Sequence, residues 1–274
     1  MPVDVDAEVL FSTCLSDDYA VVGLRAPAIA GAIRPGQFVM IRTAPGDVPL
    51  LRRPYSVFDL LRDADGRPMG FSILNKQVGA GSRLLFRAAP GAKFPCLGPL
   101  GRPFTLPPAG AEAWMIAGGT GLAPFATLSE ELAAAGTRRR LFYGARTGAE
   151  LFCLDRFEPL GVATVLATED GTRGETGRVT VPLARELAAR AGASPVALYA
   201  CGPEAMLRAV AELAARHGMP CEVAMERQMG CGMGGCYSCV VSVRTPEGGT
   251  RFARSCLEGP VFAAADIVWD DRTS

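Results

Sequence analysis

Near the middle of the 274-residue chain the sequence reads Ile116-Ala117-Gly118-Gly119-Thr120-Gly121-Leu122-Ala123-Pro124. An apolar run at 114–117 precedes the glycines and predicts a strand, and an Ala-rich segment at 123–135 follows them and predicts a helix. Glycines in such a turn let a phosphate approach the backbone N–H groups at the helix N-terminus. A turn that only packs a strand closely against a helix is the alternative interpretation, so a second signal is needed.

A second glycine turn supplies that signal, because Tyr199-Ala200-Cys201-Gly202-Pro203 also joins a predicted strand, 196–200, to a predicted helix, 203–217. Between the two turns lie further predicted elements: strands at 140–143 and 162–167 and a helix at 181–191. This alternation predicts a parallel sheet covered by helices. Ligands bind at the carboxyl ends of strands in such sheets, so both turns are candidate nucleotide-binding sites.

The N-terminal part of the chain has a different pattern, with short β-rich runs such as 38–41 and 70–74 between Gly/Pro turns. The absence of long helical periodicity predicts a small antiparallel barrel. Within it, Arg52-Arg53-Pro54-Tyr55-Ser56 combines cations, a ring and a hydroxyl, as a flavin with its phosphates would require. A solvated strand end with a core tyrosine is the alternative. Val78-Gly79-Ala80-Gly81-Ser82 predicts a second phosphate-sized turn.

The C-terminal part is dense in glycine and cysteine. It contains Cys231-x4-Cys236-x2-Cys239 and then Cys256, after a predicted hairpin at 240–253 that turns at Gly248-Gly249. This is the plant-type [2Fe–2S] spacing, so the four cysteines are predicted cluster ligands. Four glycines in the same loop can adopt positive φ and aim N–H groups at sulfur. A structural zinc site is the alternative, but zinc usually draws Cys-x2-Cys pairs or Cys/His mixtures.

These patterns predict three domains and a multidomain fold of the β plus α/β class. Prolines at 103, 107 and 108 and a glycine at 110 form a turn-rich joint where the pattern changes. We expect an antiparallel β-barrel at 1–108, an α/β domain with a parallel sheet at 109–220, and a small cluster domain at 221–274. A chain that is 49% hydrophobic can bury cores of this size.

The composition excludes several classes of partner. Lys+Arg and Asp+Glu both number 28, which leaves no net field for nucleic acid or an anionic membrane. The acidic N-terminus does not read as a secretory signal, and no apolar run is long enough to span a bilayer. Nine cysteines, four at ligand spacing, predict reduced thiols rather than a disulfide scaffold. We therefore expect a cytoplasmic protein.

In their order along the chain, these motifs resemble the ferredoxin-reductase superfamily, and most closely the electron-transfer subunits of NAD-dependent, class 1B dihydroorotate dehydrogenases. The run Leu97-Gly98-Pro99-Leu100-Gly101 also belongs to the resemblance. It implies an FAD-binding barrel, an NAD domain and a [2Fe–2S] domain. The FAD contacts that it implies are Arg53, Pro54, Tyr55, Ser56, Gly79, Gly81 and Ser82. The implied NAD(H) contacts are Gly118, Gly119, Thr120, Gly121, Cys201, Gly202 and Pro203, and the implied cluster ligands are Cys231, Cys236, Cys239 and Cys256.

The resemblance also implies a function: electron transfer between NAD(H), FAD, the cluster and an FMN-containing flavoprotein dehydrogenase subunit, in a hetero-oligomer that serves pyrimidine biosynthesis. A nicotinamide exchanges two electrons and a cluster one, so the flavin must convert between them. No side chain need act as an acid or base, and we expect no catalytic residue. The alternatives are a stand-alone NAD(P)H reductase that feeds an oxygenase, ferredoxin or hydrogenase-type partner, and an iron–sulfur sensor or scaffold.

The nucleotide preference follows from Thr168-Glu169-Asp170-Gly171, at the end of a predicted strand. Carboxylates at this position can accept hydrogen bonds from a free ribose 2′-hydroxyl and repel a 2′-phosphate. We therefore predict NAD(H) rather than NADP(H).

Overall fold

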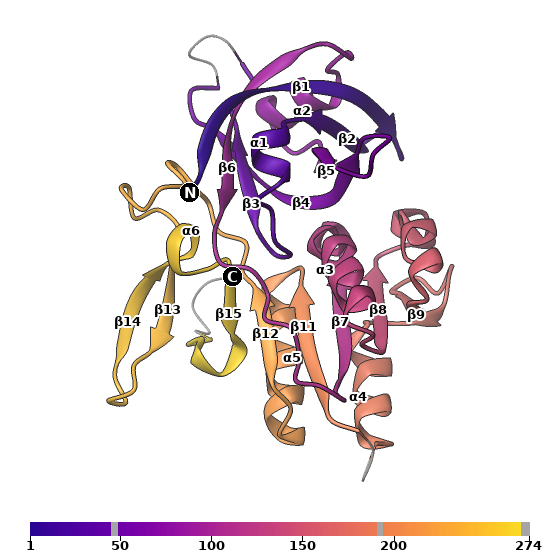
Figure 1. The fold of residues 1–274 in the computed structure, drawn as a ribbon. Coiled ribbons are helices and arrows are strands. Elements are labelled where there is room, and N and C mark those ends of the chain that lie inside the picture. The colour runs from indigo at the N-terminus through magenta and orange to yellow at the C-terminus, as the bar shows by residue number, and fades with distance from the viewer. Residues whose placement is uncertain (45–48, 191–193, 270–274) are drawn as a thin grey trace.

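The computed structural model describes residues 1–44, 49–190 and 194–269. A β-barrel lies against an α/β domain, and the C-terminal segment forms a third unit beside both (Figure 1). The predicted multidomain fold class is therefore confirmed. In the part of the chain that is described, no helix combines the length and apolar character needed to span a bilayer.

The barrel consists of six strands, each antiparallel to both of its neighbours, in the order β1-β2-β5-β4-β3-β6. Their bounds are β1 Val3–Cys14, β2 Tyr19–Arg25, β3 Phe38–Ile41, β4 Arg53–Arg62, β5 Pro68–Lys76 and β6 Lys93–Leu100. Closure leaves no unpaired strand edge. Two short helices, α1 Pro27–Ala30 and α2 Ala80–Phe86, complete the unit. Inward-facing side chains such as Leu24, Phe71 and Ile73 are fully buried.

The α/β domain contains a seven-stranded sheet in the order β10-β9-β8-β7-β11-β12-β15, parallel except for the last pair. Its strands are β7 Glu112–Gly118, β8 Arg139–Ala145, β9 Ala163–Thr168, β10 Glu175–Thr176, β11 Val196–Cys201, β12 Cys221–Ala224 and β15 Val261–Ala263. The four predicted parallel strands are confirmed. Because the strand order reverses between β7 and β11, the sheet has its topological switch point there.

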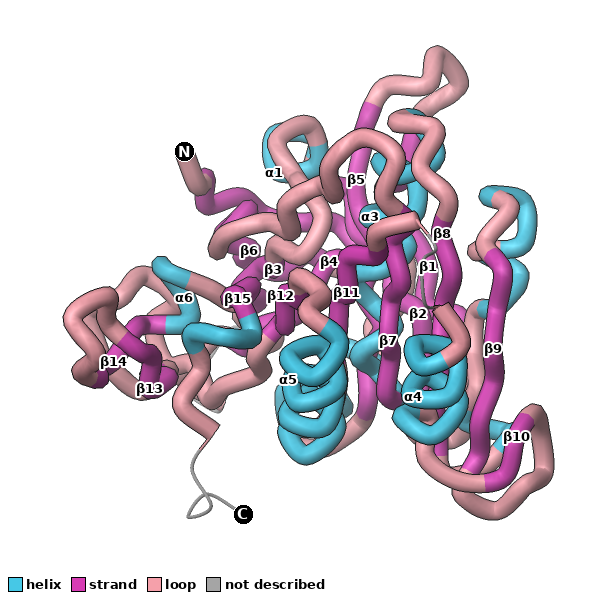
Figure 2. Tube along the Cα trace, turned by 90° about the horizontal axis from the view of Figure 1, so that it is seen from below, coloured by secondary structure: helices cyan, strands magenta, loops and turns pink. Residues whose placement is uncertain are grey.

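Helices cover both faces of this sheet. Helix α3, Ala123–Ala134, covers the face toward the barrel, where it packs with Phe58, Leu74 and Phe104 of the N-terminal part. Helices α4, Thr180–Ala188, and α5, Glu204–His217, cover the other face (Figure 2). The helix predicted at 181–191 thus ends earlier, and residue 191 lies outside the described residues. Short 3₁₀ turns lie at Gly119–Leu122, Gly148–Glu150, Leu154–Arg156, Glu158–Leu160 and Ala264–Asp266.

An ion-pair network joins the barrel to the α/β domain. Arg156 Nη2 lies 2.8 Å from an oxygen of Asp59 in β4, and the same guanidinium contacts Glu130 in α3. All three side chains are half-buried, which reduces screening by solvent. This network holds α3 and the end of β4 in a defined arrangement.

The C-terminal unit contains the predicted hairpin, formed by β13 Val240–Arg244 and β14 Thr250–Arg254, followed by α6, Ser255–Glu258. Strands β12 and β15 belong to the seven-stranded sheet, so the predicted boundary at residue 220 falls inside that sheet. These two strands have only four and three residues, which is too short for a hydrophobic pattern in the sequence to predict them. The division into three domains remains a prediction. Two strands of the predicted third domain, β12 and β15, pair with the sheet of the second.

Candidate functional site

The two glycine turns meet at the switch point of the sheet. One follows β7 and the other follows β11, and these strands are parallel neighbours. A Cβ atom at Gly121 would overlap the backbone carbonyl of Cys201, so a glycine is required for this close approach. Gly121 therefore brings the turns together, and the neighbouring residues remain available to a ligand.

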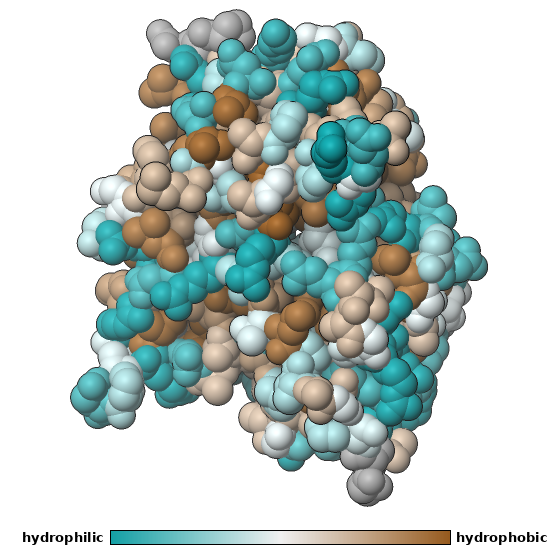
Figure 3. Space-filling view, in the orientation of Figure 1, coloured by the Kyte–Doolittle hydropathy of each residue, from teal (hydrophilic) through white to brown (hydrophobic). Residues whose placement is uncertain are grey.

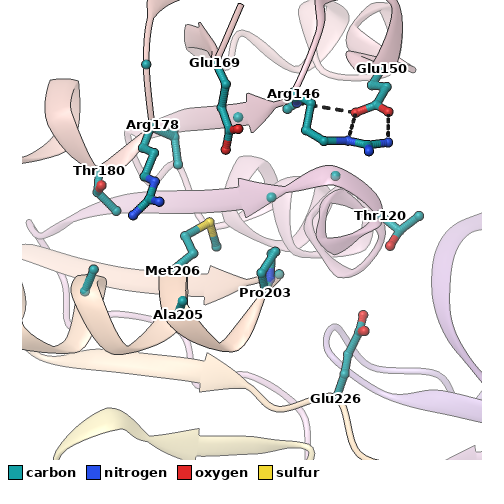
Figure 4. A pocket seen from close by; sticks show the side chains of 18 of the residues that line it. Thr120, Arg146, Glu150, Glu169, Arg178, Thr180, Pro203, Ala205, Met206 and Glu226 are labelled. Carbon is teal, nitrogen blue, oxygen red and sulfur yellow. Dashed lines mark hydrogen bonds and ion pairs between the residues drawn. The ribbon is translucent and has the colours of Figure 1, made fainter. Parts of the chain in front are cut away.

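A cavity of about 470 Å³ opens between the turns and the carboxyl ends of β8 and β9 (Figure 4). We call it the sheet-edge cavity. The predicted residues among its lining are Gly118, Gly119, Thr120, Gly202 and Pro203. Residues that the sequence reasoning had not assigned to NAD(H) include Tyr19, Arg146, Glu150, Arg178 and Met206. Its position at the switch point is where a dinucleotide binds in this type of sheet.

Charged side chains divide into paired and unpaired groups in this cavity. Arg146 Nε lies 3.3 Å from a carboxylate oxygen of Glu150, and this hydrogen bonding lowers the pKa of Glu150. Within the described ranges, the Glu169 and Arg178 side chains have no hydrogen-bond or ion-pair partner, and Figure 4 shows both projecting into the cavity. One carboxylate and one guanidinium are thus free to meet a ligand.

The residue after Glu169 has a different role. The Asp170 carboxylate accepts hydrogen bonds from the Thr172 backbone N–H at 3.0 Å and from its hydroxyl at 2.7 Å. These bonds lower the pKa of Asp170. Of the two predicted carboxylates, Asp170 therefore stabilises its own turn, and only Glu169 faces the sheet-edge cavity.

A second cavity, of about 350 Å³, lies between the barrel and the α/β domain, where the surface is hollowed in Figure 3. We call it the barrel-side cavity. Its walls include the predicted residues Pro54, Tyr55, Ser56, Thr120 and Cys201. The remaining lining is mainly apolar: Phe38, Leu74, Val78, Ala123, Ala224, Met225, Met229 and Pro260, with Lys76, Glu226 and Arg227. Such a slot suits a planar, largely apolar ring system with a few polar contacts.

The two cavities share Lys76, Thr120 and Glu226. The Glu226 side chain lines both cavities and has no hydrogen-bond or ion-pair partner among the residues described. The side chain is exposed to the solvent that fills the cavities, but the protein on both sides partly desolvates the carboxyl, and this desolvation raises its pKa. Glu226 follows β12 in the same way that Thr120 follows β7. The sequence did not predict a strand at β12, and Glu226 was therefore missed.

The remaining predicted FAD residues lie beside these cavities and line neither of them. Arg53 Nη1 donates a hydrogen bond to the carbonyl oxygen of Leu51 at 2.7 Å. The Ser82 hydroxyl accepts hydrogen bonds from the N–H groups of Val78 and Gly79 at 2.9 and 3.0 Å, so it shapes the turn. Gly81 lies against Thr43, whose hydroxyl would be 3.0 Å from an added Cβ atom.

Two buried polar atoms test whether this region fits FAD. The Thr43 hydroxyl and the Asn75 side-chain oxygen have no hydrogen-bond partner among the described residues. Buried polar groups are normally satisfied, so such atoms indicate where a bound polar group belongs. They lie beside the turn at 79–82, which the sequence predicts to be a phosphate-sized turn. The apolar slot and the unsatisfied polar end together fit a flavin nucleotide.

The four predicted ligand cysteines interact with one another. The Cys236 thiol interacts with Cys231, and the Cys256 thiol interacts with Cys239 and electrostatically with Cys231. No three His, Cys, Asp or Glu side chains in the described ranges converge as a single metal ion would require. An all-cysteine ligand set at the plant-type spacing, in a glycine-rich loop, fits a [2Fe–2S] cluster better than the Cys-x2-Cys pairs or Cys/His mixtures of zinc sites.

The environments of the four thiols differ. The Ser238 hydroxyl lies 3.2 Å from Cys236 Sγ, and this hydrogen bond lowers the pKa of the exposed Cys236 to about 6. Burial raises the pKa of Cys256 to about 12 in the apoprotein. Cys236 is thus exposed and Cys231 half-buried, whereas Cys239 and, from α6, Cys256 are buried.

The cysteine loop, residues 230–239, packs against the barrel. Cys239 and Cys256 belong to a buried cluster with Phe38, Met40 and Leu100, and Met229 packs against it. An added Cβ atom at Gly232 would lie 2.6 Å from Met40 Cγ, so the loop approaches β3 closely. Phe38 and Met229 also line the barrel-side cavity. These two apolar side chains therefore belong both to the cavity lining and to the packing around Cys239 and Cys256.

A closed barrel with a flavin-shaped slot, a switch-point cavity and paired thiols define a nicotinamide-dependent flavoprotein reductase that carries an iron–sulfur domain. A family model described as "Oxidoreductase NAD-binding domain" matches residues 115–212, and one described as "Iron-sulfur cluster binding domain of dihydroorotate dehydrogenase B" matches residues 226–268. The chain belongs to the family of dihydroorotate dehydrogenase B (NAD(+)) electron transfer subunits.

Two relatives show this membership. The electron transfer subunit of Desulforamulus reducens is 36% identical over 97% of this chain and 98% of its own. That of Geobacillus thermodenitrificans is 38% identical over 89% of this chain and 91% of its own. Among solved structures, an NADH-dependent reduced ferredoxin-NADP oxidoreductase superposes with a TM-score of 0.82 at 25% identity, over 97% of this chain and 90% of that one. A ferredoxin reductase of carbazole 1,9a-dioxygenase superposes with a TM-score of 0.66 at 24% identity, over 80% and 67%.

These findings confirm the predicted family, the oxidoreductase activity and the cofactor set of FAD, NAD(H) and a [2Fe–2S] cluster. Membership of an electron transfer subunit family also implies a catalytic partner subunit. The individual cofactor-binding residues and cluster ligands stay predictions, with the placements described above.

Proposed function

We propose that this chain carries electrons between NAD(H) and an FMN-containing subunit that oxidises dihydroorotate, with which it forms a hetero-oligomer in pyrimidine biosynthesis. The observation that carries the proposal is the central position of the barrel-side cavity. It shares Lys76, Thr120 and Glu226 with the sheet-edge cavity, and Phe38 and Met229 with the packing around the thiols. A cofactor held there would lie between the nucleotide site and the thiols.

The bound cofactors supply hydride exchange between nicotinamide and flavin and one-electron exchange at the cluster. The residues of the chain bind and orient these cofactors. Gly119, Thr120 and Gly202 position the nucleotide at the switch point, and Tyr55 and Ser56 hold the flavin. Burial raises the pKa of Tyr55 to about 12, which keeps its phenol protonated as a hydrogen-bond donor. No side chain needs to transfer a proton.

An exposed apolar surface supports a resident partner. Met233, Tyr237 and Leu257 are 63%, 60% and 44% exposed, and all lie on or against the cysteine loop. We call these three residues the apolar docking surface. Apolar side chains suit a stable interface, whereas transient carriers are steered mainly by complementary charge. This favours a permanent flavoprotein subunit over a diffusing ferredoxin. We further propose a cytoplasmic location, because all nine cysteines are free thiols.

The test is co-expression with flavoproteins encoded nearby, followed by anaerobic purification. We expect a complex that contains FAD, FMN, iron and acid-labile sulfide, and that reduces NAD⁺ when dihydroorotate is added. Zinc in place of iron would refute the cluster assignment. A chain that stays alone and rapidly reduces a soluble ferredoxin or oxygenase would establish the stand-alone reductase instead.

A further inference from the structure

Arg254, the last residue of β14, contacts the cysteine loop at two points. Its Nη1 donates a hydrogen bond to the carbonyl oxygen of Gly234 at 3.0 Å. Its guanidinium carbon also lies 4.8 Å from the centroid of the Tyr237 ring, a cation–π distance. Both contacted residues lie between the first and last cysteines of the loop, Cys231 and Cys239. One side chain from the hairpin therefore bridges the loop internally.

The contact with Tyr237 holds a strained residue. Tyr237 has φ +56°, in the left-handed region that a bulky residue rarely adopts. Such a conformation persists only where the surrounding structure enforces it. Tyr237 directly follows Cys236 and lies two residues before Cys239, so its conformation sets the direction in which both thiols point. The stacked guanidinium is the side chain that holds its ring.

The charge of Arg254 is not neutralised by an ion pair. The nearby Glu258 carboxylate pairs with Arg251 at 2.7 Å and accepts a hydrogen bond from the backbone N–H of Arg254 at 3.2 Å. No carboxylate in the described part of the chain forms an ion pair with the Arg254 guanidinium. Glu258 also attracts the Arg254 guanidinium electrostatically, but this one carboxylate lies near two arginines, so a net positive charge remains beside the cysteine loop.

We propose that Arg254 is a positioning residue for the iron–sulfur site, which holds the ligand loop in shape and raises the reduction potential of the bound cluster. The inference rests on the proposed assignment of Cys231, Cys236, Cys239 and Cys256 as ligands. Reduction adds one negative charge to a cluster held by four thiolates, and a nearby cation stabilises the more negative state. The same residue accordingly tunes how readily the site accepts an electron.

The charge is tested by an anaerobic redox titration of the purified full-length holoprotein, followed by the EPR signal of the reduced cluster. We expect Arg254→Gln to shift the equilibrium for cluster reduction about tenfold toward the oxidised state, or about 59 mV for one electron. Arg254→Lys keeps the charge and should retain most of the potential. Arg244→Gln removes a charge from the far end of the same hairpin and is the matched control, with no expected shift.

The positioning role is tested by the rate at which a chelator removes iron. Both Arg254 variants should lose iron faster than wild type, because neither side chain can stack and bridge as the planar guanidinium does. Adding Tyr237→Gly to Arg254→Gln should restore retention but not the potential, since glycine adopts positive φ without support. FAD content and reduction of FAD by NADH report whether each variant is folded.

Distinct results would overturn the proposal. An Arg254→Gln potential equal to that of wild type refutes the effect of the charge, and unchanged iron retention in both Arg254 variants refutes the positioning role. Wild-type protein that holds no iron would instead refute the cysteine assignment itself.

Discussion

Gly121 and Cys201 are in such close contact that a single added carbon at Gly121 would overlap the carbonyl oxygen of Cys201. The two residues are far apart in sequence, and each lies in one of the two glycine turns. Their contact closes the switch point of the sheet. The apposition of the turns therefore depends on the absence of a side chain at one position.

We expect Gly121→Ala to destabilise the protein by about 1–3 kcal/mol, because the methyl group must displace backbone. The turns would separate, so the apparent affinity for NADH should also fall. Chemical denaturation and NADH titration of FAD reduction measure the two effects. Gly31→Ala is the control, because Gly31 has φ −67° and its added Cβ would meet only ordinary contact. Equal stability of the two variants would contradict the role of the contact.

Glu226 lies where the two cavities join, so its replacement should affect hydride exchange rather than cluster chemistry. We expect Glu226→Gln to slow reduction of FAD by NADH about tenfold, as expected for the loss of one hydrogen bond to a charged group. Stopped-flow absorbance in the absence of the partner measures this step. Reoxidation of the flavin through the cluster should be unchanged, and a normal rate of reduction by NADH would rule out contact between Glu226 and the nucleotide.

The ionisation of Glu226 should make the apoprotein less stable as the pH rises. Partial desolvation in the cleft raises the folded-state pKa of this carboxyl, so its stabilising contribution is present below the unfolded pKa and is lost as the pH rises through the folded pKa. Glu226→Gln removes the ionised group. We expect the melting temperature of the variant relative to wild type to increase from about pH 4 to about pH 8, by a small amount because the side chain is exposed to solvent. Thermal melts across this range measure the difference, and a constant difference would contradict the raised pKa.

Glu169 should determine the preference for NADH. Its carboxylate faces the sheet-edge cavity without a partner, while Arg146 is paired with Glu150. We expect Glu169→Gln to lower the ratio of kcat/KM for NADH over NADPH about tenfold, because the repulsion of a 2′-phosphate is lost. Asp170→Asn is the matched control, since the Asp170 carboxylate accepts hydrogen bonds from Thr172 and does not line the cavity. A wild-type preference for NADPH would refute the assignment.

The apolar docking surface should be needed for transfer to the partner and not for reduction by NADH. We expect Met233→Asp or Leu257→Asp to weaken the complex at least about tenfold, since a charge would be buried in an apolar interface. Gel filtration measures association, and stopped-flow absorbance measures transfer. Val181→Asp on α4 is the control, because Val181 is 59% exposed but lies in the α/β domain, away from the cysteine loop. Equal effects of all three changes would show that the surface is not specific.

The sequence by itself determined the features that depend on short-range spacing. Glycine turns between a strand and a helix, and cysteines at ligand spacing in a glycine-rich loop, are local because backbone conformation and chelation act over a few residues. The barrel, the parallel sheet, the hairpin and the cofactor set could therefore be predicted. Thr120 lines both cavities and Tyr55 lines the barrel-side cavity, whereas Cys201, which was predicted to contact NAD(H), lines only the barrel-side cavity. These residue assignments stay predictions.

Only the tertiary structure decided which side chains from distant segments meet. Glu226 joins the site because β12 adds to the sheet beside β11, and Arg254 reaches the cysteine loop because the hairpin folds back on it. Ser82 and Asp170 stand in predicted motifs, yet their side chains stabilise their own turns. Such roles depend on long-range packing, which places a side chain by the shape of its surroundings and leaves no periodic or spacing signal in the sequence.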